Sequence, residues 1–192
     1  MFCCFSGRAL GCACCSDPGT REEGVVKVSE FHRAQIVGLE FGAEAELFMT
    51  DAGEESVKGI SALADKYRLT VALDEKRWRL TIRTKDGKTG MLTLPIPSKL
   101  GTFQVDPRDG RKSAGGGPLL YKEWRWEGVP NAEGIFLKGS QRYSLVFQGH
   151  GNRCDDASDF SHWRLEVTGK NISYVLFGAF GREDANEEKA EE

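Results

Sequence analysis

The segment from Gly149 to His162 holds most of the side chains in this sequence that are able to bind a metal or act on a substrate. Carboxylate and amide oxygens on one loop suit Ca²⁺, although their spacing does not follow the EF-hand pattern. A cysteine between two histidines suits a transition metal, or a nucleophile with a histidine base. The residues are Asn152, Asp155, Asp156 and Asp159 for calcium, and His150, Cys154 and His162 for the other two sites.

A plain loop accounts for the same composition without a ligand. Ser158 followed by Asp159 is typical of a local turn, in which such side chains bond to nearby backbone. A cysteine nucleophile is identified by its geometry with a base, and sequence does not contain that geometry. The sequence therefore favours a loop and predicts no catalytic residue, no metal and no cofactor.

Five of the six cysteines lie within the first 15 residues, at Cys3, Cys4, Cys12, Cys14 and Cys15. A disulfide framework distributes its cysteines over the fold, which these do not, and no histidine lies near them in sequence to complete a zinc site. Clustered cysteines beside small and aromatic residues suit S-acylation, and two acyl chains give stable membrane attachment where one is marginal. Acylation is the leading prediction; a metal or redox role, or no role, are the alternatives.

The first four residues, Met1-Phe2-Cys3-Cys4, resemble the start of neuromodulin-type proteins, whose paired cysteines near the initiator methionine are palmitoylated. The resemblance implies acylation at Cys3 and Cys4 and carries no information on the rest of the chain. Phe2 excludes N-myristoylation, which requires glycine at that position. A secretory signal is not expected, because Ser6, Gly7 and Arg8 interrupt the apolar stretch that it needs.

A row of basic residues follows later in the chain. Arg77, Arg79 and Arg83 occupy alternate positions, so a strand would place them on one face, with Lys85 in the turn after it. Guanidinium groups bind phosphate oxygens through charge-assisted hydrogen bonds, and each basic residue near an anionic leaflet contributes about 1 kcal/mol. These four residues are therefore candidate anion- or lipid-binding residues, and a solvated face without a ligand is the alternative.

The arginines lie on the middle strand of a predicted antiparallel meander. Leu69–Leu73 alternates, residues 74–76 form a turn, Asp86-Gly87 favours a hairpin, and residues 90–94 return. Roughly nine strands predict a mainly β fold, one antiparallel sandwich or barrel, with pleckstrin-homology-like and calycin-like barrels both compatible. Further strands are expected at 119–126, 134–138, 142–148, 162–168 and 172–177.

One short helix is expected to pack on this sheet. Apolar residues recur at three- and four-residue spacing from Glu54 to Tyr67, which favours an amphipathic helix there. Residues 25–50 are ambiguous: Val25–Val28 suits a strand, Ser29–His32 suits the start of a helix, and Ala43–Met49 fits either type. Residues 106–118 are expected to form a long loop.

Aromatic residues are concentrated in the second half of the chain. On alternating strands they would fill the core, whereas in a closed or half-closed sheet they would line a ligand cavity. Arg125, between two tryptophans, is expected to stack on a neighbouring ring. The aromatic residues are Tyr121, Trp124, Trp126, Phe136, Tyr143, Phe147, Trp163, Tyr174 and Phe177.

Length and charge divide the 192 residues into three parts. Residues 1–23 form the cysteine-rich segment and linker, residues 24–180 one β domain, and residues 181–192 an acidic tail, expected to be disordered, with six acidic and two basic residues. The composition, 40% hydrophobic and 29% charged, is typical of a soluble globular domain. The body has a net charge of only +2 once both ends are set aside, so a dedicated nucleic-acid binder is excluded.

These features predict a non-enzymatic adaptor or scaffold, a peripheral membrane lipoprotein that recruits a protein or an anionic lipid. Because the body contains one isolated cysteine, a reducing compartment and the cytoplasmic face of a membrane are expected. The layout is similar to that of apicomplexan inner-membrane-complex sub-compartment proteins, which join an acylated N-terminus to one pleckstrin-homology-like domain; those begin Met-Gly, and this chain begins Met-Phe. The alternative is a β barrel that binds a small ligand or carbohydrate, and an enzyme that uses residues 149–162 is a third hypothesis.

Overall fold

The computed structural model describes residues 19–49, 56–58, 64–74, 76–107, 120–153 and 156–181. These residues form eleven strands, one α-helix and one 3-10 turn, so the fold is mainly β, as predicted. In chain order the elements are β1 (Arg21–Lys27), α1 (Glu30–Val37), β2 (Glu44–Met49), β3 (Ala64–Leu73), β4 (Arg77–Arg83), β5 (Thr89–Pro95), β6 (Lys99–Val105), β7 (Tyr121–Gly128), β8 (Asn131–Gly134), β9 (Gln141–His150), η3 (Ala157–Asp159), β10 (Phe160–Gly169) and β11 (Ile172–Ala179).

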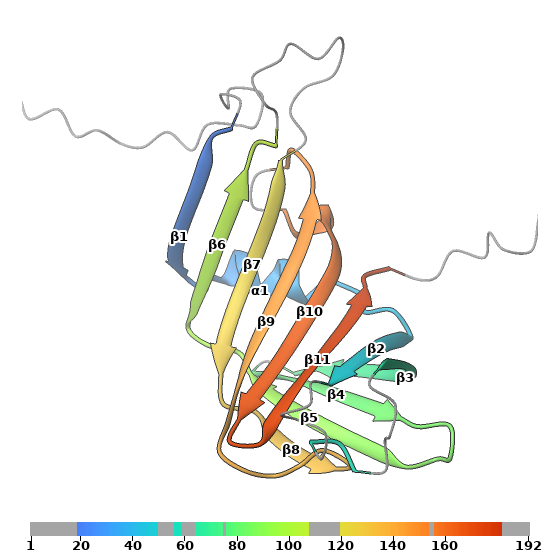
Figure 1. Cartoon of the computed structure of the whole chain (residues 1–192). Helices are drawn as coiled ribbons and strands as arrows, with labels where there is room; N and C mark the ends of the chain where they lie inside the picture. Colours follow the sequence, from blue (N-terminus) through green and yellow to red (C-terminus); the bar gives the residue numbers. More distant parts are fainter. Residues whose placement is uncertain are drawn as a thin grey trace, which may run out of the picture.

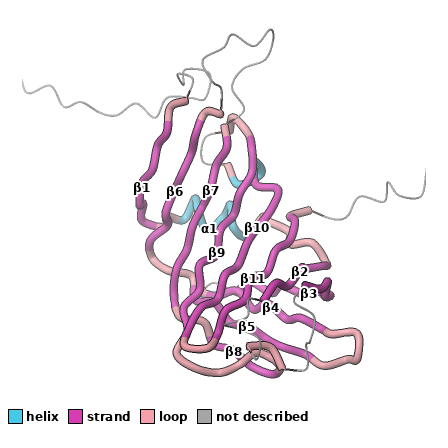
Figure 2. The backbone as a smooth tube through the Cα atoms, viewed as in Figure 1, coloured by secondary structure: helices cyan, strands magenta, loops and turns pink. Residues whose placement is uncertain are grey.

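All the strands belong to one sheet, in the order β1-β6-β7-β9-β10-β11-β2-β3-β4-β5-β8, and each neighbouring pair is antiparallel. In Figure 1 one part of the sheet stands upright and contains β1, β6, β7, β9, β10 and β11 side by side. The other part, which contains β2, β3, β4, β5 and β8, lies across the lower ends of these strands. The smooth trace in Figure 2 follows the same bend. Since β1 and β8 are the two edges of the sheet, it is not a closed barrel, and the fold is sandwich-like.

The core lies between the two parts of the sheet. Trp78 of β4 meets Trp126 of β7 edge to face, with ring centroids 5.5 Å apart, and Phe136 stacks on Tyr174 at 5.3 Å. These four side chains are at most 1% exposed. Most of the aromatic residues therefore fill the core, as the alternation predicts. The core also includes Trp124, Tyr143, Phe147 and Trp163.

Two of the aromatic residues instead belong to the outer surface: Tyr121 is half-buried and Phe177 is 37% exposed. Arg125 stacks on a ring, as expected, with its guanidinium carbon 5.4 Å from the centroid of Phe103. Arg21 lies over the same ring at 5.0 Å. This outer face is thus a mixture of aromatic and charged groups.

Helix α1 begins at the position where the sequence allowed a helix. The Ser29 hydroxyl accepts a hydrogen bond from the His32 backbone N–H at 3.2 Å, and the His32 ring accepts one from the Ser29 backbone N–H at 3.1 Å. This reciprocal capping satisfies two amides that the first helical turn leaves unpaired. The helix buries Ile36 and places His32 edge-on against Trp124 at 5.4 Å, so it packs on the sheet through only a few side chains.

The predicted helix over residues 54–67 is wrong for its last part. Strand β3 begins at Ala64, and its inward positions include the buried Tyr67 and Leu69. The apolar residues of this stretch fit both helical spacing and the alternation of a strand. They form a strand because their backbone pairs with β2 and β4. Residues 54–55 and 59–63 lie outside the described residues.

Other boundaries also differ from the prediction. Strand β1 begins at Arg21, inside the expected linker, because its backbone pairs with β6. Strand β6 lies just after Pro95 and Pro97, where no strand was predicted; the prolines end β5 and fill the connection, and Gly101 is accommodated within β6. Strand β8 ends at Gly134, where a strand was expected to begin. Strands β1 and β8 form the two edges of the sheet and β6 lies next to β1; all three carry weak local patterns, which is why the predicted number of strands was too low.

Candidate functional site

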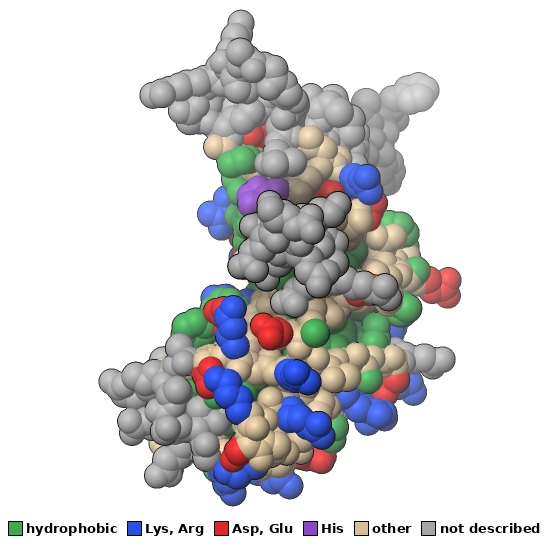
Figure 3. Space-filling view, turned by 90° about the vertical axis from the view of Figure 1, so that its right-hand side faces the viewer, with side chains coloured by type: hydrophobic (Ala, Val, Ile, Leu, Met, Phe, Trp, Pro, Cys, Tyr) green, Lys and Arg blue, Asp and Glu red, His purple; other side chains and the backbone are tan. Residues whose placement is uncertain are grey.

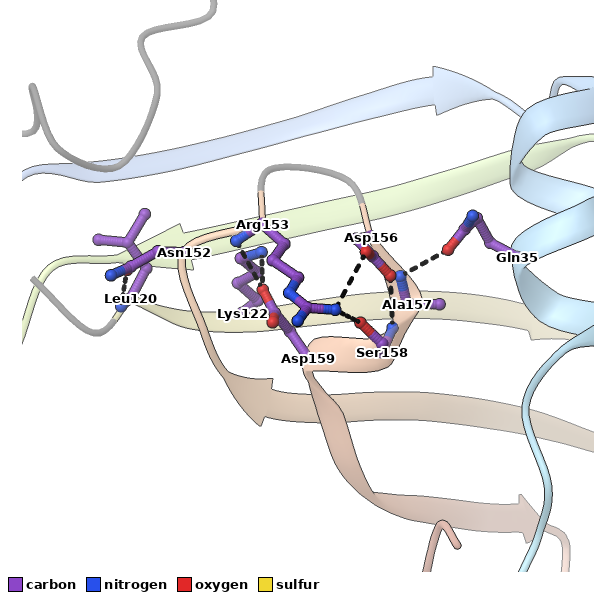
Figure 4. A network of polar contacts seen from close by, with 9 residues as sticks. All are labelled: Gln35, Leu120, Lys122, Asn152, Arg153, Asp156, Ala157, Ser158 and Asp159. Carbon is purple, nitrogen blue, oxygen red and sulfur yellow. Dashed lines mark hydrogen bonds and ion pairs between the residues drawn. The ribbon is translucent and has the colours of Figure 1, made fainter.

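The segment from Gly149 to His162 uses its polar side chains to hold the fold together. The Asp159 carboxylate forms an ion pair with the Lys122 ammonium, and both side chains are less than a tenth exposed. The same carboxylate accepts a hydrogen bond from the Arg153 backbone N–H at 3.0 Å. Figure 4 shows these groups pointing toward one another between the strands and the 3-10 turn. A buried ammonium needs such a partner, so the role of Asp159 is accounted for.

The neighbouring candidates are engaged in the same way. Asp156 caps the 3-10 turn by accepting the Ser158 backbone N–H at 2.8 Å, and this hydrogen bond is the main cause that lowers the pKa of Asp156. The Asn152 side-chain oxygen accepts the Leu120 backbone N–H at 3.4 Å, and the Ala157 backbone N–H donates to Gln35 of α1 at 2.9 Å (Figure 4). The segment is therefore a structured connection between β9, β10 and α1.

The proposed metal ligands do not assemble into a site in the described part of the chain. His150 lies edge-on to Tyr121, with ring centroids 5.3 Å apart, and the His162 ring contacts the Ser161 hydroxyl at 2.9 Å. Within the described ranges, no group of three or more His, Cys, Asp or Glu residues is placed to hold a metal ion. Cys154, Asp155 and the five N-terminal cysteines lie outside those ranges.

The arginine row lies on one face of β4, as predicted. Arg77, Arg79 and Arg83 are exposed, whereas Trp78 and Leu80, between them, have no exposed surface. The inward residues are held by the core, so the register of the outward residues is fixed by packing. Figure 3 shows Lys and Arg side chains gathered over the lower half of the molecule, with acidic side chains among them.

Acidic neighbours neutralise one end of this row. Arg77 and Arg79 both bind one carboxylate oxygen of Asp74, at 3.0 and 3.1 Å. The Lys76 backbone N–H, and then the Arg77 side chain and backbone, lower the pKa of Asp74 and keep it ionised. Lys85 lies 3.5 Å from Asp65. Three of the four predicted anion-binding residues thus already have a carboxylate partner.

Arg83 differs, because the residue opposite it on the neighbouring strand is another arginine. It is the register partner of Arg68 on β3, so the two guanidinium groups leave the sheet side by side on its outer face. Both residues are exposed, and within the described part of the chain neither forms an ion pair. Glu44 is the register partner of Arg68 on β2, yet no ion pair joins them. Like charges directly opposite on neighbouring strands destabilise a sheet, so an anion placed between them would relieve this repulsion.

We call the outer surface of β3 and β4 around these two residues the Arg68–Arg83 face. It continues on one side into the register pair Thr70 and Thr81, whose hydroxyl groups are further hydrogen-bond donors. Sequence reasoning missed Arg68, because the predicted strand began one residue later, at Leu69. The turn that pairs Leu73 with Trp78 contained the signal, since the same register pairs Arg68 with Arg83.

Two surface grooves have residues of β3 in their walls. One, of about 380 Å³, lies between the end of β11 and the start of β2, and Glu46, Lys66 and His162 contribute to its walls. The other, of about 620 Å³, lies between β3 and the residues after α1, with Leu39 and Val71 in its walls. Gly181 contributes to both. Trp163 of the core and Phe177 of the outer surface contribute to the walls of the first groove.

Comparison with protein families, curated proteins and solved structures found no match for the chain. Among the described residues, no helix has both the length and the apolar character needed to cross a bilayer.

Proposed function

We propose that this protein is a non-enzymatic, membrane-anchored adaptor whose β domain binds anionic lipid through the Arg68–Arg83 face. The pair of exposed arginines that form no ion pair with any described residue is the observation that carries the proposal. Guanidinium groups are weakly hydrated and match phosphate geometry, which suits them to lipid headgroups. A binding role is preferred to catalysis, because the described candidates for chemistry between Gly149 and His162 already serve the fold.

The face and the anchor have complementary roles in this proposal. The two arginines of the face would contribute about 1 kcal/mol each near an anionic leaflet, which is too little to hold a protein at a membrane alone. Two acyl chains on the N-terminal cysteines would supply stable attachment, since each buried CH₂ contributes about 0.8 kcal/mol. The anchor would then set the residence time, and the face would set the orientation of the domain and its preference for anionic lipid.

The length of the segment before β1 limits which acylated cysteines would still allow the Arg68–Arg83 face to reach the bilayer. β1 begins at the upper end of the molecule, and the turn between β4 and β5 lies at the lower end (Figure 1). Cys15 is connected to Arg21 by a chain that reaches at most about 20 Å, whereas the chain from Cys3 reaches about 60 Å. Acylation at Cys3 and Cys4 would therefore leave the domain freest to turn its arginines toward the bilayer.

The anchor is tested by cell fractionation. The wild type is expected in the membrane fraction, and hydroxylamine, which cleaves thioesters, is expected to release it. The matched variant carries Cys3→Ser, Cys4→Ser, Cys12→Ser, Cys14→Ser and Cys15→Ser and is expected in the soluble fraction. Equal partitioning of the two proteins would refute the anchor.

The face is tested with purified protein that carries no acyl chains. Binding to phosphatidylserine-containing liposomes is measured at low salt and at about 0.15 M salt, where screening over about 8 Å should weaken it. The double variant Arg68→Gln/Arg83→Gln is expected to bind several-fold more weakly than the wild type. Arg77→Gln/Arg79→Gln is the matched control, since it removes the same charge from residues that Asp74 already neutralises. Equal losses in both variants would show a non-specific charge effect and reject the site.

A further inference from the structure

Gly181, the residue before the acidic segment, lies close to the strands that carry the Arg68–Arg83 face or adjoin it. The backbone N–H of Gly181 donates to the Glu40 carbonyl at 2.8 Å, and the Phe180 N–H donates to Ser161 at 2.9 Å. Gly181 also contributes to the groove that contains Glu44 and Lys66. These contacts hold the last described residue at the start of β2, the strand that pairs with β3 and hence adjoins Arg68.

The distance from Gly181 to the arginines is short compared with the length of the acidic segment. Neighbouring strands lie about 4.8 Å apart, so β3 and β4 are only two and three strand spacings from β11. Residues 182–192 span up to about 36 Å when extended. They contain six carboxylates and two basic side chains, a net charge of −4.

We propose that residues 182–192 bind the Arg68–Arg83 face of the same chain and compete there with anionic ligands. Tethering keeps these carboxylates at an effective concentration in the millimolar range, so weak contacts are sufficient to occupy the face. Each exposed ion pair is modest and screened by salt, so a membrane that presents many anionic headgroups displaces the segment. The segment thus raises the density of anionic lipid that the domain requires. Its role in lipid binding rests on the proposed function, whereas the intramolecular contact does not.

The contact itself is tested without any lipid, by NMR of the full chain. The test variant neutralises the segment with Glu183→Gln, Asp184→Asn, Glu187→Gln, Glu188→Gln, Glu191→Gln and Glu192→Gln, and leaves every domain residue unchanged. The expected result is a shift of the Arg68 and Arg83 side-chain N–H signals at low salt, with Arg77 and Arg79 little affected. Unchanged signals for Arg68 and Arg83 would overturn the proposal. This readout is independent of the membrane, so it stands or falls separately from the proposed function.

The competition is tested by liposome binding in a double-mutant cycle. Neutralising the segment is expected to strengthen binding of the otherwise wild-type chain several-fold, and to do the same in the Arg77→Gln/Arg79→Gln background. In the Arg68→Gln/Arg83→Gln background the gain is expected to disappear. An equal gain in all three backgrounds would mean that only net charge matters, and would overturn the competition. If NMR detects the contact and no protein binds liposomes, the proposed function fails and the intramolecular contact stands.

Discussion

Two polar regions of this domain differ in how their charges are paired and exposed. At the upper end, the ammonium of Lys122 and the carboxylate of Asp159 are buried together, and backbone amides take up further oxygens of the segment. On the outer face of β3 and β4, Arg68 and Arg83 are exposed and adjacent, and they form no ion pair within the described residues. The first region stabilises the fold, and the second leaves charge available for a ligand. Mutations should therefore separate stability from binding.

The largest expected effect is on the buried pair. Asp159→Ala removes the carboxylate that contacts Lys122, and breaking a buried pair from one side costs about 3–5 kcal/mol. The free energy of unfolding is measured by urea denaturation with tryptophan fluorescence. Asp156→Ala is the matched control, because it removes a cap from an exposed turn and should cost about 1 kcal/mol or less. A loss below about 1 kcal/mol for Asp159→Ala would contradict the structural role of the pair.

The next effect should appear in binding and not in stability. Asp74→Asn keeps an oxygen for the backbone N–H groups of Lys76 and Arg77 but removes the charge that neutralises Arg77 and Arg79. Removal of this one negative charge should strengthen liposome binding by up to about fivefold, since each charge near an anionic leaflet contributes about 1 kcal/mol. In the Arg77→Gln/Arg79→Gln background the same substitution should have little effect. A similar gain there would show that pairing with Asp74 does not distinguish the two ends of the row.

A smaller effect is expected from removal of residues 1–18. Thr20 accepts a hydrogen bond from the Asp106 backbone N–H at 2.9 Å and β1 begins at Arg21, so the cut falls before the first described contact. The free energy of unfolding should change by less than about 0.5 kcal/mol, and liposome binding of non-acylated protein should be retained. Removal of residues 1–27 also deletes β1 and should destabilise the domain clearly. Loss of cooperative unfolding in the shorter truncation would place part of residues 1–18 in the fold.

The smallest effect concerns the turn after β4. Lys88 lies 2.7 Å from Asp86, and this contact, followed by the Thr84 hydroxyl, lowers the pKa of Asp86 from 3.8 to about 2. Because the folded-state pKa is the lower one, the contact stabilises the fold above pH 3.8 and its contribution is lost as the pH falls toward 2. NMR titration should find a depressed pKa for Asp86, and Lys88→Gln should return it toward the ordinary value. An unchanged pKa of Asp86 in the Lys88→Gln variant would show that Lys88 does not interact with Asp86.

The meander was predictable because its signals are local. Alternation between Arg77 and Arg83 defines an inner and an outer face, and the Asp86-Gly87 pair marks the turn, where Gly87 adopts a positive φ of 82°. Strand β6 and the first part of β3 were missed or misassigned, because their residues form strands only by pairing with segments distant in sequence. Sequence analysis therefore predicted the strands whose partners are near in sequence and missed those whose partners are distant.

The candidate site shows the same division. The sequence by itself determined that Arg77, Arg79 and Arg83 share one face, since successive side chains of a strand point to opposite sides. Only the tertiary structure decided which of them keeps an available charge, because that depends on where Asp74 and Arg68 lie across the turn and the neighbouring strand. A charge becomes available or neutralised through its neighbours in space, and the register of the sheet chooses those neighbours.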